Sequence, residues 1–281
     1  MMRGALRAAA LALLLLSLAR AAPSAAAEAN GGRDAAYSAA LDAGMRHFYG
    51  SRFPAARADF ARAHARAPGD TLTDAFYAAA CVRSGERLSA LVSDLAERAA
   101  LAPGDADAQT LLGFAELIPG SRSDLRDEAR LAFVRAERLA PAAAGPHVGL
   151  GILAFQRHAV TEAKGELLLA QRLDPHEVLA REYLARVDLI YLREPVAALA
   201  VLIDVTNAVP GYADAYYLLG EAAVAARRYD LAAAFLERTL ALDPHGVGQG
   251  GRYGRALLLR AYEAAGRVED AARVRREGGG Q

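Results

Sequence analysis

Apolar residues recur along this chain with a period near 3.6, in segments that end at regularly spaced prolines. Residues 150–175 and 218–244 show the same order of apolar and small positions, as in LGILAFQRHAVTEAKGELLLAQRLDP for the first of them. Since proline cannot continue a helix, each closing proline marks the end of the second helix of a two-helix unit. The prolines are separated by 35, 38, 34, 35 and 34 residues, and they are Pro68, Pro103, Pro141, Pro175, Pro210 and Pro244.

Small residues recur at fixed positions within four of these units. In each of these units a glycine of the first helix is followed at a fixed distance by an alanine of the second. The distance is 12 residues for Gly44–Ala56, Gly151–Ala163 and Gly220–Ala232, and 16 residues for Gly113–Ala129. Two antiparallel helices approach closely only where small side chains let their ridges interlock, and a helical glycine costs about 1 kcal/mol against alanine. The recurrence therefore indicates a helix-crossing point. We expect large residues one turn further on to fill the space beside the neighbouring unit: Phe60, Phe133, Leu167 and Leu236.

The unit resembles the tetratricopeptide repeat, a helix–turn–helix of 34 residues. The residues that carry the resemblance, besides the prolines, are Gly44, Ala56, Phe60, Ala63, Leu112, Gly113, Ala129, Phe133, Ala136, Leu150, Gly151, Ala163, Ala170, Tyr216, Leu219, Gly220 and Ala232. The resemblance implies an all-α fold, a superhelical solenoid of antiparallel helix pairs over residues 37–277, with about six repeats and a C-terminal capping helix pair. Two units depart from it, with Leu91, Arg98 and Arg186 where small residues belong.

The first residues lie outside the repeat pattern. Arg3 and Arg7 precede a 12-residue apolar stretch, 8–19, and small residues follow, which is the layout of a secretory signal peptide. We predict a signal peptide at 1–27, a short linker at 28–36 and a flexible tail at 278–281. An uncleaved anchor and an organellar transit peptide are the alternatives for this segment. A helix needs about 20 apolar residues to span a bilayer, so we expect no stable membrane span and an exported protein, periplasmic or secreted.

Charge and cysteine content narrow the classes of partner. The chain has 33 basic and 33 acidic residues. Removal of 1–27 takes away three arginines and no acidic residue, which leaves 30 basic and 33 acidic residues and a net charge of −3. Electrostatic binding of nucleic acid normally goes with a basic excess, so no nucleic acid partner is expected. Cys81 is the only cysteine, which excludes a disulfide within the chain. We expect it to be a small buried side chain, with an intermolecular disulfide or a reactive thiol as alternatives.

Two stretches have the form of catalytic or ligand-binding motifs. GVGQGG at 246–251 matches G-x-G-x-x-G, but it follows a helix where the dinucleotide motif follows a strand, so we interpret it as a flexible loop. HEVLA at 176–180 begins like a zinc-protease helix, but Ala180 stands where the second histidine belongs. The other histidines show no zinc-ligand spacing. We therefore expect no catalytic residue, no cofactor and no metal site.

The resemblance also implies a binding surface. In tetratricopeptide proteins the first helix of each pair lines the concave face, where an extended or helical segment of another protein lies. The alternative for each aromatic residue is packing against the neighbouring unit, since an error of one residue turns a side chain by about 100°. The register gives a partner-binding groove lined by Phe48, Tyr49, Phe76, Tyr77, Phe114, Phe155, Tyr183, Tyr191 and Tyr217.

The predicted function is therefore that of a non-enzymatic adaptor or scaffold. It is expected to be exported and to hold a peptide or protein segment in its groove during assembly of envelope complexes, an expectation that rests on family analogy. Two alternatives use the same apolar surface: a scaffold that self-associates, and a carrier of lipid or another small molecule.

Overall fold

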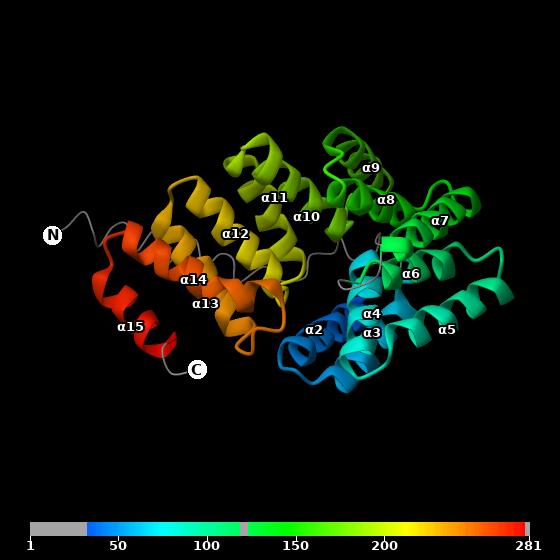
Figure 1. The fold of residues 1–281 in the computed structure, drawn as a ribbon, viewed down its shortest axis with the longest axis horizontal. Helices are drawn as coiled ribbons and strands as arrows, with labels where there is room; N and C mark the ends of the chain where they lie inside the picture. Colours follow the sequence, from blue (N-terminus) through cyan, green and yellow to red (C-terminus); the bar gives the residue numbers. More distant parts are fainter. Residues whose placement is uncertain (1–32, 119–122, 279–281) are drawn as a thin grey trace.

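The computed structural model describes residues 33–118 and 123–278, and all regular secondary structure within these residues is helical (Figure 1). The predicted signal peptide and residues 279–281 of the predicted tail lie outside the described residues. The first described helix begins at Ala35, two residues before the predicted start of the array. The elements are α2 (Ala35–Tyr49), α3 (Phe53–Arg66), α4 (Thr71–Arg83), α5 (Leu88–Leu101), α6 (Ala106–Glu116), α7 (Ser123–Leu139), α8 (Ala144–Gln156), α9 (Val160–Leu173), α10 (Val178–Val187), η2 (Asp188–Leu192), α11 (Pro195–Ala208), α12 (Ala213–Ala225), α13 (Tyr229–Leu242), α14 (Gln249–Ala264) and α15 (Val268–Gly278).

The closing prolines end the second helix of each pair, as predicted. In all six units that helix stops two residues before the proline, because the residue preceding a proline disfavours the helical conformation. Aspartates then start two of the following helices: the Asp70 carboxylate accepts the Thr73 N–H at 2.9 Å, and Asp105 accepts the Ala108 N–H at 3.1 Å. The six last residues are Arg66, Leu101, Leu139, Leu173, Ala208 and Leu242.

Each of the predicted crossing points is a glycine covered by one large side chain. A Cβ added to Gly44 would lie 2.5 Å from Cε1 of Phe60, and one added to Gly220 would lie 2.6 Å from Cγ of Leu236. The crossing role of the glycines is thus confirmed. The large residues cover the glycine of their own unit, and two of them also reach the next unit as expected: the Phe60 ring lies 5.5 Å from that of Phe76. Phe133 does both, since it contacts Gly113 and Gly149.

The two units without the small residues have altered geometry. In the second unit α5 lies closer to α6 than to its own partner α4, and Leu91 and Leu95 are buried in a cluster that also contains Cys81. In the fifth unit Arg186 points its guanidinium at Glu182, with 2.8 Å between Nε and Oε1, and α10 passes into the π-helical turn η2. Arg193 ends this turn in the left-handed region, with φ at 59°. A π-helical turn inside a helix is uncommon and often lies near a functional surface.

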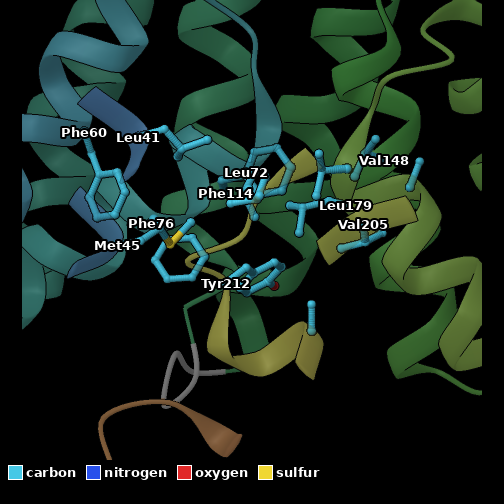
Figure 2. Close-up of a cluster of buried hydrophobic side chains, with 14 of the residues drawn as sticks. Leu41, Met45, Phe60, Leu72, Phe76, Phe114, Val148, Leu179, Val205 and Tyr212 are labelled. Atoms are coloured by element: carbon cyan, nitrogen blue, oxygen red, sulfur yellow. The ribbon is translucent and has the colours of Figure 1, made fainter. Parts of the chain in front are cut away.

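The superhelix is so tightly coiled that its first two units touch the fifth and sixth. Figure 2 shows Met45 and Phe76 next to Tyr212, and the rings of Phe76 and Tyr212 lie 5.6 Å apart. A Cβ on Gly211 would lie 3.3 Å from Cβ of Met45. In Figure 1 α2 lies beside the loop between α13 and α14, where Gly248 contacts Tyr49. One hydrophobic core therefore fills the concave side, from α2 through α4, α8 and α10 to the start of α12.

Candidate functional site

Five of the nine predicted groove residues lie in the core. The exposed fractions are 7% for Phe48, 1% for Tyr49, 9% for Phe76, 3% for Phe114 and 6% for Tyr217. No partner reaches these rings in the closed superhelix, so the expectation that they line an open groove is corrected. Closure covers Tyr49 and Phe76, which contact the start of the sixth unit. Phe114 packs on Phe133 of its own unit, and Tyr217 is buried in a separate cluster, against α14. Tyr77, Phe155, Tyr183 and Tyr191 are half-buried.

Three of the half-buried rings come together as one aromatic cluster, formed by Phe155, Tyr183 and Tyr191. The Phe155 ring lies 5.4 Å from that of Tyr183 and 5.6 Å from that of Tyr191, both edge to face, a favourable geometry for aromatic pairs. The Arg186 guanidinium lies over the Tyr183 ring at 5.4 Å, and His158 Nδ1 is 2.6 Å from the Tyr191 hydroxyl. The turn η2 places Tyr191 here, so the departure of the fifth unit from the repeat pattern builds this cluster.

Exposed apolar side chains are frequent on the helical elements that follow Phe155 and Tyr183 in the chain. Within the described part of the chain, five of the ten exposed large hydrophobic side chains fall between residues 168 and 203, and Val196 is the most exposed of the five at 68%. They lie on α9, η2 and α11, and Lys164 of α9 approaches Asp188 of η2 to 4.0 Å. The apolar patch consists of Leu168, Ile190, Leu192, Val196 and Ile203. The sequence carried a signal for it: in DLIYLREPV, 188–196, consecutive apolar residues cannot all face inward.

A polar clasp closes the superhelix near the start of α2. Arg33 donates from Nε to Asp70 Oδ2 at 2.9 Å and from Nη1 to Asp174 Oδ2 at 2.7 Å, and its Nη2 lies 3.7 Å from Glu177 Oε2. The Thr71 hydroxyl donates to Glu177 Oε1 at 2.5 Å. We call these five residues the clasp. It borders a cavity of about 440 Å³ between the turns that join successive units. The sequence carries no local signal for the clasp, because nothing pairs Arg33 with residues 141 and 144 positions later.

Closure buries several carboxylates. Burial raises the pKa of Glu177 to about 8, and the nearby Asp70 carboxylate acts in the same direction, while the Thr71 hydrogen bond and Arg33 oppose the shift. Burial also raises the pKa of Asp214, against the Gly250 N–H that donates to it. Inside the closed clasp Glu177 therefore keeps its proton to a higher pH than an exposed glutamate does.

The glycine-rich segment 246–251 is held in place by carboxylates. Asp243 accepts the backbone N–H groups of Val247 and Gly248 at 2.8 Å each and that of Gly251 at 3.2 Å. In a dinucleotide-binding loop such N–H groups face the pyrophosphate. Here the carboxylates of Asp243 and Asp214 accept the hydrogen bonds of these N–H groups, and α14 begins at Gln249. The expected flexible loop is thus a hydrogen-bonded helix start.

Three histidines each contact one carboxylate across neighbouring helices. The Nδ1–oxygen distances are 2.5 Å for His47–Asp59, 2.7 Å for His64–Asp74 and 2.8 Å for His147–Glu166. Burial raises the pKa of Asp74 to about 6, and its hydrogen bond raises the pKa of His64. Residues 33–118 and 123–278 contain no group of three or more His, Cys, Asp or Glu side chains placed to hold a metal ion. Over the same residues, no helix is both long enough and apolar enough for a membrane span.

Comparison with known proteins bears on the fold. No family model matches the chain, and no curated protein matches it. A chain in the crystal structure of the APC/C hetero-tetramer Cut9–Hcn1 superposes with a TM-score of 0.60 and 19% identity, over 81% of this chain and 43% of that one. A thermophilic TPR protein of Thermus thermophilus gives 0.48 and 20%, over 67% and 99%. MamA from Desulfovibrio magneticus RS-1, residues 41 to the end, gives 0.46 and 22%, over 61% and 96%.

The chain spans less than half the length of the Cut9–Hcn1 chain that it resembles. At this identity the likeness concerns the fold. Together with the helix pairs, their closing prolines and the covered glycines, it defines the class of protein: an all-α, superhelical solenoid of the tetratricopeptide type.

Proposed function

We propose that this chain is a non-enzymatic scaffold for protein–protein interaction, and that it holds its partner on the aromatic cluster and the apolar patch. The observation that carries the proposal is the concentration of exposed apolar side chains on α9, η2 and α11. Soluble proteins rarely expose such side chains together unless the surface binds something. Phe155, Tyr183 and Tyr191 supply rings of the kind that dominate binding energy at interfaces, next to Arg186.

The proposed site differs from an open concave groove. Its partner is a protein that presents an apolar segment or helix face to units four and five. The proposal includes export to the periplasm or secretion, supported by the signal-peptide pattern at 1–27, and a role in assembling envelope complexes, supported by analogy alone. A solenoid suits this role because its repeats give an extended, firmly packed surface.

The test is affinity capture from the native envelope fraction with residues 28–281 as bait. The variant Ile190→Asp with Val196→Asp places two charges in the patch, and Leu101→Asp with Val268→Asp is the matched control at exposed apolar positions outside it. We expect a protein that is held by the native bait and the control and lost by the patch variant. Retention of the same protein by the patch variant would contradict the proposal.

A self-associating scaffold is the second candidate, and the same patch favours it. If the native chain shows a concentration-dependent mass in solution that the patch variant lacks, the partner is another copy of this chain. If purified protein carries bound lipid, the carrier function takes precedence over both.

A further inference from the structure

Few direct contacts hold the two ends of the superhelix together. Polar contacts across the closure include those of the clasp, which reach the turn between the fourth and fifth units, and that of Tyr49, whose hydroxyl donates to Asp214 at 3.3 Å. Apolar contacts add Met45 against Gly211 and Phe76 against Tyr212. We call the first two units one arm and the fifth and sixth units the other. Within these arms, α2 with α3 and α12 with α13 pack far more extensively.

The polar part of this closure depends on one cation, the Arg33 guanidinium. Asp70, Asp174 and Glu177 converge on one guanidinium, and Asp70 and Glu177 are almost fully buried. An ionised carboxylate held away from water is costly unless a cation or hydrogen-bond donors lie beside it. Arg33 is that cation. Without it, the buried Asp70 carboxylate would lose its ion pair and Asp174 would lose its link to the first unit, which disfavours the closed state.

We propose that Arg33 is a conformational latch. It holds the first two units against the turn between the fourth and fifth units, and its release opens the superhelix and uncovers the inner aromatic face. The closed state predominates while Arg33 is seated, because the contacts of Met45 and Phe76 also favour closure. This inference goes beyond the proposed function and does not depend on the apolar patch. A negative result for one of the two proposals therefore leaves the other untouched.

The test measures the distance between the two arms in the full chain. Cys81 is replaced by alanine, and cysteines at the exposed Ala61 of α3 and Ala241 of α13 carry spin labels for pulsed distance measurement. Arg33→Gln removes the charge and keeps most of the side-chain size. Arg66→Gln is the matched control, since Arg66 forms a solvent-exposed pair with Asp34, at 2.9 Å, in the same helix pair.

We expect one short, narrow distance in the parent protein and in Arg66→Gln. Arg33→Gln should add a longer, broader component that amounts to about 10% or more of the molecules, with helix content by circular dichroism unchanged. Small-angle scattering of the unlabelled Arg33→Gln protein gives a second reading, and its radius of gyration should increase.

Two results would overturn the proposal. One is an unchanged distance and radius of gyration in Arg33→Gln with helix content retained, because the arms then close without the latch. The other is loss of helix content in Arg33→Gln, because Arg33 would then belong to a single cooperative core and not to a releasable contact.

Discussion

The Tyr49 hydroxyl donates a hydrogen bond to Asp214 Oδ2 at 3.3 Å, which joins residues 165 positions apart. The same carboxylate accepts the Gly250 N–H at 2.7 Å, so it connects the first helix, the sixth unit and the start of the capping pair. The Tyr49 ring packs edge to face on Phe48 and Phe76. A side chain with these contacts is part of the core and stabilises the closed superhelix.

Substitution of Tyr49 distinguishes a core role from a groove role. Tyr49→Phe removes one long hydrogen bond and should lower the free energy of unfolding by about 0.5–1.5 kcal/mol. Tyr49→Ala leaves a cavity and should cost about 3–5 kcal/mol. Urea denaturation measures both. Tyr253→Ala is the control, because Tyr253 is 52% exposed and its loss should change stability by no more than about 0.5 kcal/mol. If Tyr49→Ala matched that control, Tyr49 would be a surface residue after all.

The crossing glycines give a second prediction. Gly220→Ala should destabilise the protein by about 1–3 kcal/mol, because the new Cβ would lie 2.6 Å from Cγ of Leu236. Gly165 is also helical but has nothing within 4 Å of its would-be Cβ, so Gly165→Ala should stabilise by about 0.5–1 kcal/mol. Denaturation midpoints of the two variants should therefore move in opposite directions. Equal shifts would mean that the glycines do not set the helix spacing.

The repeat was predictable because its causes are local. A proline ends a helix wherever it stands, and a glycine recurring 12 residues before an alanine marks a close approach whatever the rest of the chain does. The second helix of each unit therefore ends where the prolines indicated, and Gly44 and Gly220 lie under Phe60 and Leu236.

Closure was not predictable in the same way, because periodicity shows which faces are apolar but not what covers them. Phe76 belongs to an apolar face whether that face binds a partner or packs on Tyr212. The outcome depends on small rotations accumulated over several units, and on pairings such as Arg33 with Asp174 that no local pattern encodes. Units two and five contribute here, since α5 leans on α6 and α10 ends in a π-helical turn.

Buried carboxylates should make stability depend on pH. The pKa of Glu177 is about 8 in the folded protein, against an ordinary value of 4.5. Between these values the folded protein keeps a proton that the unfolded chain releases, so the free energy of unfolding falls as pH rises through this window. Glu116, with a pKa raised to about 7 by burial, acts in the same direction.

The corresponding measurement compares denaturation midpoints at about pH 5.5 and about pH 8.5, an interval that covers most of the range between the two pKa values of Glu177. Glu177→Gln cannot ionise and still presents an oxygen to the Thr71 hydroxyl, so it should reduce the loss of stability at the higher pH. Exposed Glu269→Gln is the control and should leave the pH dependence as it is. An equal pH dependence in the native protein and Glu177→Gln would show that Glu177 is ionised in the folded state throughout.

Asp243 should be the residue that orders the glycine-rich segment. Its carboxylate is 1% exposed and accepts three backbone N–H groups, so Asp243→Ala leaves these donors without their partner and should cost about 1.5–3 kcal/mol. Hydrogen exchange of the Val247 and Gly248 amides should accelerate much more than that of amides within α13. Asp230→Ala, at an exposed position in the first turn of α13, should leave both amides protected. If Val247 and Gly248 stayed protected in Asp243→Ala, their order would come from backbone packing and not from the carboxylate that occupies the place of a phosphate.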